Sequence, residues 1–166
     1  MNKITVMLAA ALSLLSCNAA AQNVTKHPAR PAGAILQSVS IKPGAAVLYV
    51  SGQLASPIVE ADALTPAAPS IRDFGDTRAQ TISALSKVKA ILAEHGYDLG
   101  DVIKLTLFVV GDPQLGGKAD IAGMNDGFKQ FFGTAANPST VARSAVQVAA
   151  LVGPQYLIEI EAVAAK

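Results

Sequence analysis

Apolar and polar residues alternate with two different periods along the chain. A period of two predicts five strands, over residues 35–41, 47–53, 102–110, 142–148 and 156–164. Apolar residues three and four positions apart predict two helices, one from about 73–77 to Gly96 and one from 120 to Gly133. The order strand, strand, helix, strand, helix, strand, strand predicts an α+β fold in which two helices cover one face of one sheet.

Turn-forming residues predict the connections between these elements. A Lys-Pro-Gly turn at 42–44 joins the first two strands, so we expect a hairpin there. Prolines exclude a helix from 54–70, which is predicted to be a long loop with one short strand at most. Residues 22–34 contain two prolines and a glycine and are predicted to be an irregular N-terminal segment, so the folded domain is expected over 35–166.

The first 21 residues have the pattern of a secretory signal peptide. Lys3 precedes an apolar run at 4–15, and three alanines at 19–21 form a cleavage site. The run is too short for a membrane span, so we expect export to a bacterial periplasm or out of the cell. A second interpretation stays open, in which residues 14–17 are a lipoprotein processing site and Cys17 carries a membrane anchor.

Composition narrows the classes of function. Cleavage after Ala21 leaves 166 − 21 = 145 residues, enough for one domain, and removes the only cysteine. Loss of Lys3 leaves 13 − 1 = 12 Lys+Arg against 12 Asp+Glu, and a neutral chain without a basic stripe argues against nucleic-acid binding. No phosphate-binding glycine loop, metal-spaced His/Cys cluster or nucleophile elbow occurs in the sequence, and His27 and His95 are expected to be solvated.

Arg143 is a charged residue inside a strand otherwise built to be buried. Ala142, Ser144, Val146 and Val148 form one face of this strand, and Arg143, Ala145 and Gln147 form the other. A guanidinium can grip a carboxylate with two parallel hydrogen bonds. Two interpretations remain open from the residues alone: a site for a small carboxylic acid, or a structural arginine bonded to a neighbouring carboxylate or to carbonyls at a subunit contact.

The sheet face that the helices leave open also needs a partner. Its predicted positions are mixed in character, and they include Arg143, Gln147, Glu159 and Glu161. Such a mixture suits an interface between subunits better than a dry core.

Four segments together resemble the RidA (YjgF) family of reactive-intermediate deaminases. They are Tyr49-Val-Ser-Gly-Gln53, Gly75-Asp-Thr-Arg-Ala-Gln-Thr81, Ala142-Arg-Ser-Ala-Val-Gln-Val148 and Ile158-Glu-Ile-Glu-Ala-Val163, and the likeness extends from Gly33 to Ala164. The resemblance implies a chorismate-mutase-like fold, a single mixed sheet with two helices packed on one face, assembled as a homotrimer. It also implies hydrolysis of 2-imino or 2-enamino acids to 2-keto acids and ammonia without metal or organic cofactor.

The resemblance also implies roles for individual residues in a cleft between subunits. Arg143 matches the arginine that holds the substrate carboxylate, and Glu159 matches the glutamate that positions or activates water. The matched residues that shape or line the cleft are Asn125, Ser51, Gly52 and, where many relatives have cysteine, Ala145. An exposed strand carboxylate or an interface ion pair is the alternative role for Glu159.

Spacing constrains how Arg143 and Glu159 can meet. If the last two strands form a hairpin turning near Gly153, the two residues are offset by four positions, or roughly 13 Å along a strand. Either another strand lies between them or a neighbouring subunit completes the cleft.

Two features depart from the family pattern. Relatives commonly have a tyrosine in a Gly-Pro-Tyr-Ser segment where this chain has Gly33-Ala-Ile-Leu36, and Ile35 cannot donate that hydroxyl. The 54–70 loop is longer than usual and is a candidate either to cap the cleft or to alter its size. A non-catalytic trimer that binds small acids is therefore the alternative function, while the neutral charge argues against the ribonuclease activity attached to some family names.

Overall fold

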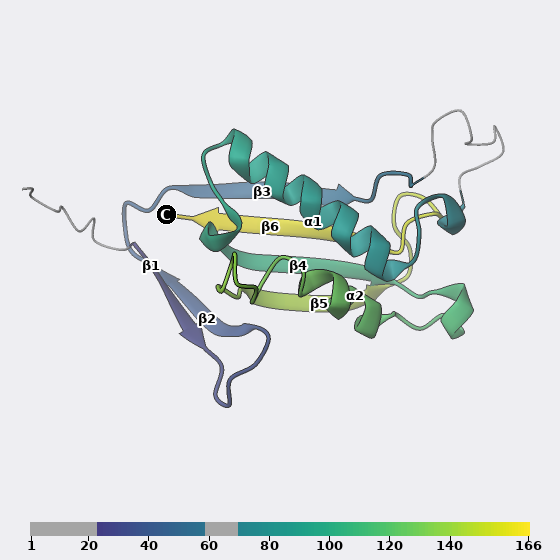
Figure 1. Cartoon of the computed structure of the whole chain (residues 1–166), viewed down its shortest axis with the longest axis horizontal. Helices are drawn as coiled ribbons and strands as arrows, with labels where there is room; N and C mark the ends of the chain where they lie inside the picture. Colours follow the sequence, from purple (N-terminus) through teal and green to yellow (C-terminus); the bar gives the residue numbers. More distant parts are fainter. Residues whose placement is uncertain (1–22, 59–69) are drawn as a thin grey trace, which may run out of the picture.

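The computed structural model describes residues 23–58 and 70–166, and its centre is a four-stranded mixed sheet (Figure 1). The strand order is β3-β6-β4-β5. These strands span Val47–Leu54 (β3), Val102–Val110 (β4), Ala142–Val148 (β5) and Ile158–Ala165 (β6). Strand β5 runs parallel to β4, and the other pairs are antiparallel, so the predicted mixed sheet is confirmed.

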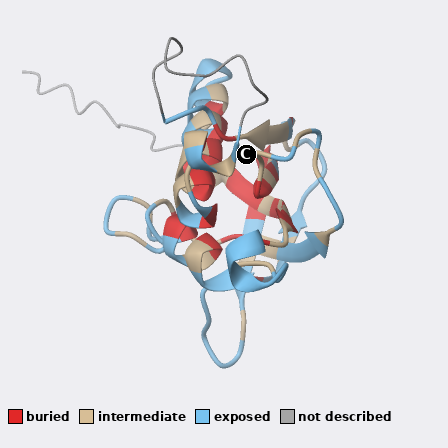
Figure 2. Ribbon diagram, turned by 90° about the vertical axis from the view of Figure 1, so that its right-hand side faces the viewer, coloured by how far each residue is buried: buried red, intermediate tan, exposed pale blue. Residues whose placement is uncertain are grey.

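Two helices, α1 (Thr77–Glu94) and α2 (Ile121–Phe128), lie on the same face of this sheet (Figure 1). Asp76 and Asp120 begin them, because each aspartate side chain accepts a hydrogen bond from a backbone N–H of the first turn. Buried residues of both helices and of the sheet lie between the two layers (Figure 2), and their side chains form one core. The α+β class with two helices on one face is as predicted.

Helix α2 is shorter than the pattern predicted. It ends at Phe128 rather than just before Gly133, and Ile121, its first residue, is 43% exposed. Phe132 is still buried and stacks on Phe128. Short 3-10 turns at Ile71–Asp73 (η2), Leu99–Asp101 (η3) and Pro113–Leu115 (η4) complete the connections between the larger elements.

The N-terminal part of the described chain differs from the prediction. Val24–Pro28, expected to be irregular, forms strand β1 and pairs with β2 (Leu36–Ile41) in a separate two-stranded sheet. The predicted hairpin between 35–41 and 47–53 is therefore wrong. Residues 42–46 connect the two sheets. At one end Lys42 N–H donates to Asn23 O, next to β1, and at the other Ala46 N–H donates to Lys166 O, next to β6.

The last two strands are not a hairpin either. Strand β4 lies between β5 and β6, which is the first of the two arrangements that the spacing of Arg143 and Glu159 allowed. Leu105 on β4 pairs with Arg143, whereas Phe108 on β4 pairs with Glu159. Positions an odd number apart on β4 face opposite sides of the sheet, so Arg143 and Glu159 do too.

This register also corrects the expectation that four polar positions share the open face. Arg143 and Gln147 lie on the helix-covered face, and Glu159 and Glu161 lie on the other. Arg143 stays accessible because β5 is an edge strand that the helices cover only in part. No described helix covers the face of Glu159, where Tyr49 is 78% and Val146 46% exposed.

Candidate functional site

Arg143 is the second residue of β5, and helix α2 fixes its side chain. Its Nη2 donates a hydrogen bond of 2.8 Å to the amide oxygen of Asn125, and its guanidinium carbon lies 4.5 Å from the centre of the Phe128 ring. Asn125 and Phe128 are three positions apart and therefore lie on one side of α2. The strand thus supplies the charge, and the helix supplies its orientation.

The other terminal nitrogen of Arg143 has no partner among the described residues. Nη1 is buried, and no described residue accepts a hydrogen bond from it. Burial lowers the pKa of the guanidinium. Within 23–58 and 70–166 the one ion pair joins Lys129 and Asp126, so Arg143 is not neutralised by a carboxylate there. A buried donor on a charged group is costly to leave unpaired, so the arrangement favours an anionic ligand.

Glu159 lies on the uncovered face, next to a bulge in β3. The register between β3 and β6 shifts between Val50 and Gln53, so Ser51 and Gly52 form the bulge, and Gly52 lies against the Glu159 carboxylate. A Cβ at position 52 would overlap the Glu159 carboxylate, so only glycine leaves the side chain in this position. Gly52 thus sets the place of the carboxylate through its missing side chain.

Ala145 is exposed and follows Arg143 on the same face of β5, which keeps the space beside the guanidinium open. Gln147, next on that face, accepts a hydrogen bond from Ala119 N–H and donates one to Gly117 O. These bonds fix the segment that leads into α2. The chain therefore groups Arg143, Asn125 and Ala145 on one face, and Ser51, Gly52 and Glu159 on the other.

Two residues near the guanidinium were assigned differently from sequence. Phe128 lies within the segment predicted to be the second helix, where no role beside Arg143 was predicted for it, yet its ring packs against the guanidinium. Gln147 was predicted to lie on the open sheet face at an interface between subunits, and instead it bonds to the 117–119 segment. The three-residue spacing from Asn125 was the available signal for Phe128, whereas nothing in the local sequence indicates the partners of Gln147.

Neither a metal site nor a membrane span is present in the described part of the chain. Its histidines and acidic residues form no cluster of three that could hold a metal ion. Its helices are too short or too polar to cross a membrane. His27 and His95 are exposed, as expected. The signal peptide and Cys17 lie outside the described residues, as does most of the 54–70 loop.

Comparison with known protein families shows which family this chain belongs to. The family described as endoribonuclease L-PSP matches residues 30–166. The chain belongs to this family. Its relatives include a RutC family protein of Pyrococcus horikoshii, 35% identical over 144 residues that cover 86% of this chain and 94% of that protein. The endoribonuclease L-PSP family is the RidA (YjgF) family, so the predicted resemblance is confirmed.

Two other relatives in the L-PSP family bear deaminase names. The putative reactive intermediate deaminase TdcF of Escherichia coli is 35% identical over 127 residues, covering 75% of this chain and 91% of that protein. The 2-iminobutanoate/2-iminopropanoate deaminase of Escherichia coli is 34% identical over 125 residues, with the same coverage.

Solved structures of the L-PSP family have the same fold. A Rid family protein of unknown function from Yersinia pestis aligns with a TM-score of 0.62 at 24% identity, covering 87% of this chain and 99% of that one. Escherichia coli TdcF with bound serine aligns with a TM-score of 0.53 at 31% identity, covering 85% and 93%.

Proposed function

We propose that the protein hydrolyses small 2-imino and 2-enamino acids to 2-keto acids and ammonia. The observation that carries the proposal is the Arg143 guanidinium, oriented by Asn125 and Phe128 but left with a buried donor and no acidic partner in the described chain. A substrate carboxylate would supply the missing acceptor. Two relatives support the reaction class, one named a putative reactive intermediate deaminase and the other a 2-iminobutanoate/2-iminopropanoate deaminase.

The chemistry needs little beyond positioning. The C=N carbon of an imine is electrophilic, so a water held beside it can attack directly once Arg143 fixes the carboxylate. In this proposal Glu159 accepts one proton of that water as the C–O bond forms and returns it to the imine nitrogen. The remaining hydroxyl proton then also passes to the nitrogen, and the C–N bond breaks to release ammonia and leave the 2-keto acid. Neither step requires a nucleophilic side chain.

The proposed site requires a second copy of the chain. Arg143 and Glu159 lie on opposite faces and on strands separated by β4, so they cannot face one substrate within one chain. The uncovered sheet face presents apolar residues beside Glu159, which supports its burial against a neighbour. We therefore place the cleft between subunits of a homotrimer, with Arg143 from one copy and Glu159 from the next.

Keto-acid release from a freshly generated 2-imino acid tests this function. Wild type should exceed spontaneous hydrolysis, and both Arg143→Ala and Glu159→Gln should lose the acceleration. Mixed trimers of the two variants should regain about a quarter of the wild-type activity, because a shared cleft reassembles where an intact arginine meets an intact glutamate. No recovery on mixing would contradict the shared cleft.

A second candidate function is non-catalytic binding of small acids. Ile35 favours it, since an apolar side chain stands where relatives carry a tyrosine hydroxyl, and the N–H of the next residue, Leu36, bonds to Val141 at the start of the Arg143 strand. Binding of a 2-keto acid that depends on Arg143, without any turnover of imines, would support this function instead.

Export remains part of the proposal. A signal peptide at 1–21 would deliver the 22–166 chain outside the cytoplasm, and Cys17 offers the lipid-anchored alternative. Mass spectrometry of the mature N-terminus distinguishes a chain that begins at Gln22 from one that begins at a lipidated Cys17.

A further inference from the structure

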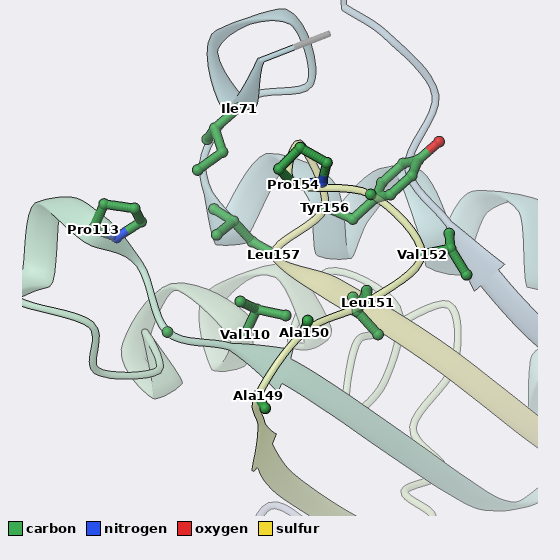
Figure 3. A pocket seen from close by; sticks show the side chains of 12 residues that line it. Ile71, Val110, Pro113, Ala149, Ala150, Leu151, Val152, Pro154, Tyr156 and Leu157 are labelled. Atoms are coloured by element: carbon green, nitrogen blue, oxygen red, sulfur yellow. The ribbon is translucent and has the colours of Figure 1, made fainter. Parts of the chain in front are cut away.

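A pocket of about 440 Å³ lies where β4 and β5 end and β6 begins (Figure 3). Ile71 and Pro113 lie on one side of it and the 149–157 loop on the other, while Leu157 points from the start of β6 toward Ile71. Its lining side chains are aliphatic, proline or aromatic, and none is charged. The Tyr156 hydroxyl is the only polar side-chain group among them, and it points away from Pro113. The pocket is therefore suited to an apolar group.

Hydrogen bonds and an aromatic contact hold the walls of this pocket in place. The buried side chain of Gln80 donates to Gln155 O and accepts from Leu157 N–H, each at 2.9 Å. The η2 turn holds Ile71, because its carbonyl accepts from Phe74 and Gly75. Phe74 also packs edge-on against Tyr156 at 5.1 Å between ring centres. Because these walls are already ordered, little free energy is lost in ordering them when a ligand binds.

The pocket adjoins the proposed water-activating carboxylate. Leu157 directly precedes β6 and is two residues before Glu159, a separation of about 7 Å along an extended chain. On β4, Val110 lines the pocket, and Phe108, two residues away on the same face, pairs with Glu159. A substrate whose imine carbon lies at Glu159 can therefore extend its side chain into the pocket.

We propose that this pocket binds the substrate side chain and selects 2-imino acids with branched aliphatic or aromatic side chains. This inference rests on the proposed function, since it takes Glu159 as the reacting end of the site. A volume of about 440 Å³ exceeds what a methyl or ethyl group fills. Charged side chains are disfavoured, because the lining offers no partner for a desolvated charge.

Imines generated from alanine, leucine, phenylalanine and glutamate provide the first test. We expect kcat/KM for the leucine-derived imine to exceed that for the alanine-derived imine by about tenfold or more, since each methylene buried in an apolar pocket contributes that order of discrimination. The glutamate-derived imine should be the poorest of the four. Equal values across the series would overturn the pocket assignment.

Two variants of the lining residues should change the preference for large substrate side chains in opposite directions. Ala150→Trp should fill the pocket and bring the leucine-to-alanine ratio of kcat/KM close to one. Ile71→Ala should enlarge it and raise the phenylalanine-to-leucine ratio. Ala93→Trp adds the same bulk at an exposed position of α1 and should leave all ratios unchanged. Unchanged ratios in both pocket variants would contradict the assignment.

Binding separates failure of the pocket from failure of the enzyme. If no imine is hydrolysed, the proposed function fails, and the pocket is then tested by calorimetric titration with 4-methyl-2-oxopentanoate and pyruvate. Tighter binding of the larger keto acid that is lost in Ala150→Trp supports the pocket without catalysis. Equal affinities for the two acids would overturn it. Turnover without any preference would leave the proposed function standing and the pocket assignment wrong.

Discussion

At the scale of single residues, the partner of Arg143 is an amide rather than an acid. The Asn125 oxygen orients the guanidinium through one hydrogen bond and leaves its full positive charge for a ligand. A carboxylate at the same distance would neutralise that charge before any substrate arrived. The choice of a neutral acceptor is therefore what makes the arginine available.

This argument predicts the effect of Asn125→Asp. The variant should keep the fold and lower the affinity for 2-keto acids by about tenfold or more, because the new carboxylate competes with the ligand for the guanidinium. Titration calorimetry with the purified variant measures it. Lys129→Ala is the control, because it removes an exposed charge at the C-terminal end of α2. Unchanged affinity in Asn125→Asp would show that the ligand does not bind at Arg143.

Gly52 acts on Glu159 by leaving space. In Gly52→Ala the new Cβ would overlap the carboxylate, so Glu159 must move away from the water it is proposed to activate. We expect kcat to fall by up to about a hundredfold, as misplacement of a reacting group by about 1 Å can cause. Imine hydrolysis at saturating substrate measures the loss.

The matched control is Gly33→Ala, since a Cβ at position 33 meets nothing within 4 Å. This control should retain wild-type kcat. If Gly52→Ala retained it as well, the carboxylate position seen in the structure would not matter for turnover, and the water-activating role of Glu159 would be wrong.

At the scale of elements, α1 and α2 approach closely because one residue between them has no side chain. A Cβ at Gly127 would lie 2.8 Å from Thr81 Cβ and 3.0 Å from Arg78 O on α1. Helix backbones cannot give way as a flexible side chain can. The position of α2, and hence of Asn125 and Phe128, depends on this contact.

Gly127→Ala should therefore destabilise the protein although alanine has the higher helix propensity. We expect the free energy of unfolding to fall by about 1–3 kcal/mol through overpacking. Urea denaturation followed by circular dichroism measures it, with Gly33→Ala as the neutral comparison. A stabilised Gly127→Ala protein would mean that the two helices can separate without cost.

Elements were more predictable from the sequence than their pairing. The periodicity of apolar residues located α1, β4 and the start of α2 closely, because each signal lies within one segment, although it extended α2 too far. The pairing of β1 with β2 and the insertion of β4 between β5 and β6 join segments far apart in sequence, and no local pattern contains them. Arg143 was recognisable as a charge in an apolar strand, but its face could not be assigned before β4 was placed beside it.

At the scale of the whole molecule, helices pack on one face of the sheet, and no described helix packs on the other. Helices cover most of the first, whereas the second, which carries Glu159, also exposes Tyr49 and Val146. Lys104 on this face donates to Ser144 rather than to an acid. Apolar area of this kind, next to a residue proposed to act with Arg143 of another copy, links assembly to activity.

Val146→Asp tests that link. The side chain lies on the uncovered face of β5, opposite Phe108, so an aspartate there should be tolerated by the single chain but should place an unpaired charge in the interface. Sedimentation velocity should show a trimer for wild type and a monomer for the variant, with an unchanged circular dichroism spectrum. The monomer should lose imine hydrolysis because Glu159 no longer meets a neighbouring Arg143.

Leu115→Asp places the same charge at an exposed residue of η4 and should remain trimeric and active. A monomeric Val146→Asp protein with wild-type activity would show that one chain contains the whole site, which the opposite faces of Arg143 and Glu159 argue against.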